Sequence, residues 1–393
     1  MKRSREMLPR IPFYRDPKLR GLLLQALLCA AIGLVAYGAI RNAAENLARA
    51  HIASGFGFWD VPAGFDISQA LINYSSQSST NGRAFWVGLL NTLLVAGLGI
   101  LFATMIGFTV GIARLSKNFL VERLATFYVE LIRNVPLLLQ LLFWYNAVLK
   151  ALPEIAASLV LPGGIILNNR GLFTPRPLFA DVWHIAGVLA GTVVLAAVFT
   201  IVTGRVERLR RATAFRVAGI AAIVIGLPVA AFLAAGAPFE FDYPEVGRFN
   251  VRGGAELLPE FVALLLGLSI YTAAFIAEVV RAGLKSVSRG QTEAAQALGL
   301  RRMQTLRLIV IPQAMRVIIP PLTNQYLNLT KNSSLAVAIG YPDLVQIFAG
   351  TVLNVTGQAV EVVVITMAVY LSFSLITSLV MNIYNARFAL VER

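Results

Sequence analysis

Acidic and basic residues that interrupt apolar stretches are the first candidates for chemistry in this sequence. Glu130 and Arg133 lie three residues apart in one apolar stretch, and Glu278 and Arg281 have the same spacing at the end of another. Residues three apart on a helix share a face, so each acid can pair with its arginine. A charge within an apolar helix needs a partner or an aqueous cavity. Both pairs are therefore candidates for a polar pathway or a gate, with anchoring of a helix end, or snorkelling of Arg133, as the alternative.

The sequence is poorly supplied with groups for catalysis or metal binding. Its 393 residues include one cysteine and two histidines, too few for a disulfide framework or a zinc cluster. The phosphate-binding pattern G-x-x-x-x-G-K-[ST] is absent, and the dipeptide Gly-Lys does not occur. We therefore expect no catalytic residue, no metal site and no cofactor bound by this chain. Any process that needs energy must draw it from an ion gradient or from a partner.

The composition indicates a membrane protein. Hydrophobic residues make up 57% of the chain and charged residues 14%, whereas soluble domains carry about 25% charged residues. A helix needs roughly 20 apolar residues to cross a bilayer. Stretches of this kind occupy residues 21–40, 84–113, 124–149, 182–204, 217–239, 261–277, 308–330 and 362–386. We predict an all-α membrane protein with about eight transmembrane helices.

The distribution of lysine and arginine predicts the orientation. Most of them fall in the segments that are cytosolic if the N-terminus is cytosolic, namely 1–20, 114–123, 205–216, 281–307 and 387–393. This is the positive-inside pattern, so both termini are expected in the cytosol. The same pattern accounts for the net charge of +14 without nucleic acid as a partner. The first apolar stretch is longer than that of a signal peptide, which favours a retained helix.

Three parts follow from this assignment. Residues 1–83 form a basic cytosolic N-terminus, a first transmembrane helix and an outer segment. Residues 84–386 form the main transmembrane domain, and residues 387–393 a cytosolic tail. The main domain is interrupted by an insert at 151–256, which we interpret as a surface loop at 153–179 and a hairpin of two membrane helices.

A short helix is predicted in the basic loop that follows residues 261–277. Ser288 and Gln291 fit a capping box at its start, and strong helix formers follow up to Leu298. Gly299 then supplies a left-handed C-terminal cap, and Leu300 the apolar contact that often follows one. The expected product is a slim stub of about two turns on the cytosolic side.

This loop resembles the signature loop of ABC importer permeases. The matching residues are Glu293-Ala294-Ala295, Gly299 and Ile309-Val310-Ile311-Pro312. The family pattern has leucine where this chain has Ile311, a mild departure.

Three further segments narrow the resemblance to the polar amino-acid branch, the histidine/glutamate/glutamine/arginine/opine permeases. They run from Glu130 to Gln140, from Tyr271 to Gly283 and from Asn324 to Leu335. The resemblance covers residues 84–150 and 257–386. The insert is similar to that of the larger permeases of general L-amino-acid uptake systems.

The resemblance implies a type I ABC importer permease fold and the import of amino acids across the bacterial inner membrane. It makes the stub a coupling helix that sits in a groove of a separate ATPase. The implied partners are two copies of a cytosolic ATP-binding subunit, which carry ATP and Mg²⁺, a second permease and a periplasmic amino-acid-binding protein. The large insert suggests that the second permease is a dissimilar sister chain. The implied coupling residues are Gly290, Glu293, Ala294, Ala295, Gly299, Arg301 and Arg302.

A second polar segment follows the pair Pro320-Pro321. These prolines free backbone carbonyls, which is tolerated only beside protein or a wet cavity. Lys331, Asn332 and Ser333 are therefore candidates for the substrate pathway, with a polar helix end as the alternative. Gly107 and Gly111 form a G-x-x-x-G pair suited to close helix packing, which we expect within this chain.

Two other classes of membrane protein remain to be weighed. An ion-driven secondary transporter needs coupling carboxylates near the midplane and commonly has inverted repeats. Here the intramembrane acids are Glu130 and Glu278, both toward the cytosol, and the sequence has no convincing repeat. A membrane scaffold would have no use for the docking loop.

Overall fold

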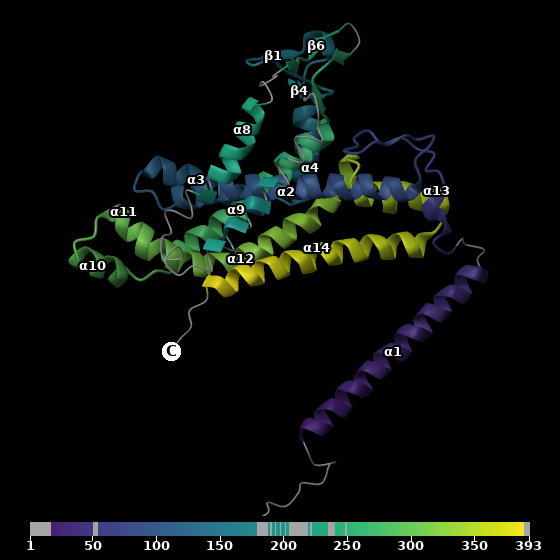
Figure 1. The fold of residues 1–393 in the computed structure, drawn as a ribbon, viewed down its shortest axis with the longest axis horizontal. Helices are drawn as coiled ribbons and strands as arrows, with labels where there is room; N and C mark the ends of the chain where they lie inside the picture. Colours follow the sequence, from purple (N-terminus) through teal and green to yellow (C-terminus); the bar gives the residue numbers. More distant parts are fainter. Residues whose placement is uncertain are drawn as a thin grey trace, which may run out of the picture. The chain divides into compact units, whose positions relative to one another are not determined.

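The computed structural model describes residues 17–49, 54–178, 240–247 and 250–388, with short helical pieces between 188 and 234. The protein is mostly helical, as predicted (Figure 1). It divides into two compact units, each described here by itself. The first unit comprises Met1–Ala96 and Tyr326–Arg393, and the second comprises Gly97–Gln325.

Helices make up the first unit. It contains α1, Pro17–Arg49; η2, Gly57–Asp60; the start of α2, Asn81–Ala113; the end of α12, Ile311–Asn332; η7, Ser333–Ile339; η8, Val345–Val352; α13, Leu353–Thr356; and α14, Ala359–Phe388. The leucines of α1 from Leu22 to Leu34 are exposed, as expected of a helix that faces lipid.

An aromatic cluster forms the core of the first unit. The ring of Phe348 lies 5.3 Å from that of Phe85 and 6.1 Å from that of Phe58, measured between centroids. Trp59 packs against both Phe85 and Phe348, at 5.1 and 5.9 Å. Aromatic pairs in tilted and edge-on arrangements add stability beyond the area they bury. The segment before α2 is therefore anchored to this core by its aromatic side chains.

Helices and short strands make up the second unit. Its helices are the rest of α2; α3, Phe119–Asn134; α4, Leu137–Leu142; η3, Phe143–Leu149; η4, Ile155–Ala157; η5, Ala222–Gly226; α8, Leu227–Ala234; α9, Pro259–Lys285; α10, Arg289–Ala297; α11, Arg302–Thr305; η6, Leu306–Val310; and the start of α12. The central element is α9, which packs against α3, α4 and η3.

Candidate membrane spans in the described residues agree with six of the predicted stretches. Five are single helical segments, Arg20–Ala39, Asn81–Ala113, Pro259–Lys285, Arg302–Ile339 and Ala359–Ile383. A sixth is the bent pair of Phe119–Asn134 and Leu137–Leu149. The predicted stretch 182–204 is described only in pieces, and the stretch 217–239 contains η5 and α8, which are not among the candidate spans. The total of eight therefore stays a prediction.

The predicted single helix over 124–149 is wrong, because α3 and α4 meet at an angle of 105°. Pro136 has no N–H to continue the helix, and it forces the residue before it out of the helical region. Val135 accordingly has φ −105° and ψ 127°. The carbonyls of Ile132 and Val135 instead accept hydrogen bonds from the Gln140 amide, each at 2.9 Å. No such break occurs at Pro320-Pro321, since α12 runs through both prolines.

Four strands lie where a surface loop was predicted at 153–179, and four more lie near the end of the insert. The first four are β1, Leu159–Leu161; β2, Ile165–Asn168; β3, Gly171–Thr174; and β4, Arg176–Leu178. The others are β5, Glu240–Asp242; β6, Glu245–Val246; β7, Val251–Arg252; and β8, Ala255–Leu257. The described pairs are all antiparallel, with order β1-β2-β3-β8 in the largest sheet and separate pairs β4-β5 and β6-β7. Ile166, Phe173 and Val251 form a small core beneath them. The insert therefore carries a β-region, which a purely helical assignment missed.

Candidate functional site

Close contact between α2 and α9 builds the scaffold of the site. A Cβ on Gly107 would lie 2.6 Å from the Ile276 side chain, and one on Gly111 would lie 2.8 Å from the Ala277 carbonyl oxygen. Both distances are shorter than van der Waals contact allows, so only glycine fits at these two positions. The G-x-x-x-G pair thus packs within the chain, as predicted.

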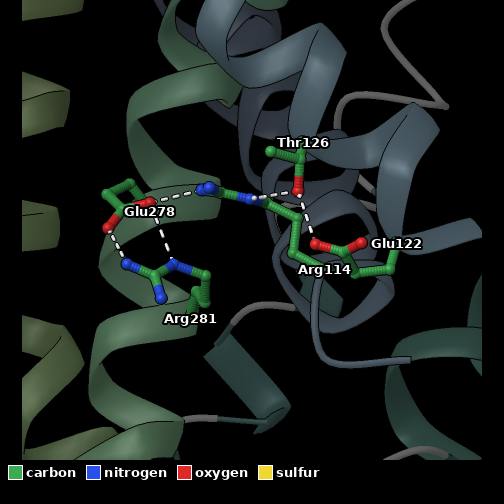
Figure 2. A network of polar contacts seen from close by, with 5 residues as sticks. All are labelled: Arg114, Glu122, Thr126, Glu278 and Arg281. Carbon is green, nitrogen blue, oxygen red and sulfur yellow. Dashed lines mark hydrogen bonds and ion pairs between the residues drawn. The ribbon is translucent and has the colours of Figure 1, made fainter. Parts of the chain in front are cut away.

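A network of charged residues joins the ends of these helices (Figure 2). Arg281 donates to Glu278 through Nε, at 3.1 Å, and through Nη2. Arg114, which directly follows α2, donates to the same carboxylate through Nη1. Its Nε lies 3.4 Å from the Thr126 hydroxyl, which in turn donates to Glu122 on α3 at 3.2 Å.

The predicted pair Glu278–Arg281 is therefore formed, but it is part of a larger network. The Arg114 side chain is only 11% exposed, so this charge is the most enclosed of the group. In the sequence, Arg114 stood out only as one of the basic residues of the predicted inner segment 114–123. The sequence did offer a signal for this contact. Arg114 directly follows one apolar stretch, and Glu278 lies at the end of another. The network fixes the ends of α2, α3 and α9 to one another.

The second predicted pair is not formed. Glu130 and Arg133 make no ion pair with each other, and both side chains are exposed. The Arg133 guanidinium lies over the ring of Phe275, 5.2 Å from its centroid. A planar cation on an aromatic face is stabilised by the ring quadrupole, which explains why Arg133 points to α9 rather than to Glu130.

The predicted stub is present as α10 and ends as expected. Gly299 has φ +74°, the left-handed conformation that glycine adopts without strain. The Leu300 N–H donates to the Ala295 carbonyl at 3.1 Å, and the Gly299 N–H donates to the Gln296 carbonyl at 2.9 Å. These two bonds define a Schellman motif. The start differs from the prediction, since the Ser288 side chain makes no capping bond even though Ser288 is the N-cap residue.

The two faces of α10 differ in exposure. Ala295 is buried against the protein, and α10 packs on α11 and η6. Glu293, Ala294 and Leu298 face outward, and the Leu298 side chain is 80% exposed. The other predicted coupling residues, Gly290, Arg301 and Arg302, are exposed as well. The stub thus presents one small acidic and apolar face bordered by arginines.

Lys331, Asn332 and Ser333 do not form a cluster. They belong to the first unit, where α12 gives way to η7. Ser333 is buried and donates to the Thr330 carbonyl at 2.7 Å, whereas Lys331 is exposed. Their placement therefore supports a structural role for Ser333, and a pathway role stays a prediction.

Within the described part of the chain, no group of three or more His, Cys, Asp and Glu side chains could hold a metal ion. The two histidines, His51 and His184, lie outside the described residues.

Comparison with known proteins decides the class of the chain. Residues 99–390 match the family described as the inner membrane component of binding-protein-dependent transport systems. The chain belongs to this family. It is therefore a membrane component of a transport system rather than an enzyme, and the ion-coupled alternative is left without support.

Full-length relatives refine the assignment of this permease. It is 51% identical over 382 residues, covering 96% of this chain and 94% of the relative, to the general L-amino acid transport system permease protein AapQ of Rhizobium johnstonii. It is 51% identical, covering 97% of both chains, to the putative amino-acid ABC transporter permease protein YhdX of Escherichia coli. It is 40% identical, covering 96% of both, to the glutamate/glutamine/aspartate/asparagine transport system permease protein BztB of Rhodobacter capsulatus.

Proposed function

We propose that this permease imports amino acids across the bacterial inner membrane and is driven by a separate ATPase that binds α10. The amino-acid cargo is supported by the names of the three relatives, which share nearly the whole chain including the insert. The breadth of those names favours a broad range of polar L-amino acids. The full importer has two ATPase subunits, a dissimilar sister permease and a periplasmic binding protein.

The single observation that carries the coupling role is the construction of α10. The helix is stopped at Gly299 by a Schellman motif, and its outward face carries Glu293, Ala294 and Leu298. An exposed leucine beside alanines offers apolar contact without bulk, which suits entry into a groove of a partner protein. Arg301 and Arg302 border this face and can meet acidic residues of the partner.

Motion of α10 has a direct route into the membrane domain. Only residues 286–288 separate α9 from α10. The end of α9 is held to the end of α2 by the ion pairs of Glu278 with Arg114 and Arg281. A displacement of α10 on ATP binding therefore moves α9 and α2 together. The membrane helices then alternate between two packing arrangements during transport, and the ATPase changes the relative stability of the two.

The pathway is proposed to run past Arg133. Its guanidinium is exposed at the side of α3 and rests on Phe275, so it is accessible to an anionic group. The carboxylate common to all amino acids is such a group, and arginine binds it through paired hydrogen bonds. Glu130, Lys331, Asn332 and Ser333 complete the set of pathway candidates.

Co-purification and uptake test this proposal. The tagged permease should retain an ATPase subunit, and the complex should take up labelled amino acids only when ATP is supplied. Glu293→Lys should reduce ATPase retention and uptake while leaving membrane insertion intact. Retention and uptake at the level of the unaltered protein would contradict the coupling role of α10.

A further inference from the structure

The β-region of the insert contains a groove of about 610 Å³ between the strand pairs β4-β5 and β6-β7. Its lining includes Leu178, Phe241, Asp242, Tyr243, Glu245 and Arg252. The function proposed above makes no use of these residues.

The wall of the groove is held by a glycine turn. Asp242 accepts a hydrogen bond from the Gly254 N–H at 3.0 Å. Gly253 and Gly254 have φ of +73° and +71°, and a Cβ on Gly253 would lie 2.6 Å from the Asp242 carboxylate. The turn therefore requires glycine, and it keeps the neighbouring side chains in a fixed arrangement.

The side chains of the groove have the composition of a protein interface. Phe241 and Tyr243 are 41% and 54% exposed, and their ring centroids are 6.0 Å apart. Glu245 and Arg252 lie opposite each other on β6 and β7, and within the described part of the chain neither forms an ion pair. Aromatic side chains and arginine dominate the centres of protein–protein interfaces, and exposed aromatic clusters mark such sites.

The position of the groove indicates which partner it meets. The strand β8 ends at Leu257, directly before α9, whereas α10 follows the other end of α9. The 27 residues of α9 span about 40 Å at 1.5 Å per residue, so the β-region and α10 lie on opposite sides of a membrane. Figure 1 shows the strands β1, β4 and β6 gathered away from α10 and α11. If α10 meets the ATPase in the cytosol, the groove faces the side from which the binding protein delivers cargo.

We propose that this groove is a docking site for the binding protein of the importer. The binding protein places a basic side chain against Glu245 and an apolar side chain on the rings of Phe241 and Tyr243. The proposal rests on the proposed function, because it takes the sidedness and the partner from it.

Binding of the purified binding protein to the complete importer in lipid nanodiscs tests the docking site. Tyr243→Ala and Glu245→Lys should each weaken the affinity by roughly tenfold or more, as expected for central interface residues. Glu154→Lys is the matched control, because Glu154 is an exposed acid of the same β-region that does not line the groove. It should change the affinity less than twofold.

A labelling experiment provides a second readout that does not depend on affinity changes. The chain has one cysteine, Cys29, so Cys29→Ser gives a background for single-cysteine variants. In the variant Glu245→Cys, the binding protein should slow maleimide labelling several-fold, whereas labelling of Glu154→Cys should be unaffected. Labelling of Glu245→Cys without the binding protein also shows that position 245 is accessible.

The outcomes separate the two proposals. If the unaltered importer binds the protein but neither groove variant weakens binding and Glu245→Cys is not protected, the docking site is refuted and the proposed function stands. If the unaltered importer neither binds the protein nor retains an ATPase, the proposed function itself fails. Weakened binding by both groove variants with an unaffected control supports the docking site.

Discussion

Arg114 and Glu278 stand at the ends of different helices and share an ion pair in which the arginine is almost enclosed. The pairing explains how an acid near the end of α9 is tolerated, since Arg281 and Arg114 together satisfy both of its oxygens. The ion pair also adds a polar contact between α2 and α9, next to the close packing at Gly107 and Gly111.

Loss of the Glu278 charge should destabilise the permease. Glu278→Gln leaves Arg114 without its counter-ion, and a poorly exposed charge without a partner costs about 1–3 kcal/mol. We expect a lower unfolding temperature of the purified complex and reduced uptake. Glu122→Gln is the control, since that side chain is 37% exposed, and it should stay within about 0.5 kcal/mol. If Glu278→Gln unfolds at the same temperature as the unaltered protein, the ion pairs of Glu278 do not stabilise the permease.

A methyl group at Gly111 should separate α2 from α9. In Gly111→Ala the added Cβ would lie 2.8 Å from a backbone carbonyl, and overpacking of this kind costs about 1–3 kcal/mol. Gly97 lies in the same helix with nothing within 4 Å of an added Cβ, so Gly97→Ala should be neutral or slightly stabilising. Thermal unfolding of both variants measures the difference, and a neutral Gly111→Ala would contradict the close packing.

The left-handed residue at the end of α10 should matter for coupling. Gly299→Ala costs about 1–2 kcal/mol because alanine is strained at φ +74°, so the end of α10 should fray and ATPase retention should fall. Asparagine tolerates this conformation better, so Gly299→Asn should restore much of the coupling. Retention of the ATPase and uptake are measured together. If alanine and asparagine behave alike, the cap does not determine coupling.

The stability of the first unit should depend on pH through Asp343, which lies between η7 and η8. Burial raises the pKa of this carboxyl from 3.8 to about 7. Between about pH 4 and pH 7 the folded protein therefore holds a proton that the unfolded chain has released, so stability falls as the pH rises through this window. Asp343→Asn keeps the acceptor for the Gln346 N–H, bonded at 2.8 Å, and removes the ionisation.

Unfolding temperatures of both proteins across this pH range test the assignment. The unaltered permease should lose more stability than Asp343→Asn between about pH 5 and pH 7.5, because only the former must ionise a buried carboxyl. Parallel curves would show that Asp343 does not titrate in this range.

Local chain chemistry determined most of what the sequence predicted correctly. The helix at 289–297 and its end at Gly299 follow from the preferences of neighbouring residues. The pairing of Glu278 with Arg281 likewise follows from their spacing of three residues on one helix. Each of these features depends only on residues within one or two helical turns, so it can be predicted from the local sequence. The small-residue face that brings α2 against α9 was visible for the same reason.

The errors come from interactions between distant residues or from competition between two partners. Arg114 meets Glu278 across a long stretch of chain, and no local pattern links them. Arg133 could face Glu130 or Phe275, and only tertiary packing selects the aromatic ring. Pro136 was visible in the sequence, but the 105° bend also needs Gln140 to satisfy the freed carbonyls. The strands of the insert are too short to produce a recognisable alternation.

The pairing of β3 with β8 has a consequence for how the protein is made. Leu172 and Leu257 face each other in the sheet, and residues 173–256 must be synthesised between them. The strands β1, β2 and β3 can pair as soon as they have been synthesised, because short turns connect them. The edge of β3 then remains open until β8 arrives, and an open edge is prone to wrong pairing. The sheet is therefore complete only once the chain has returned to the edge of β3 at residues 255–257.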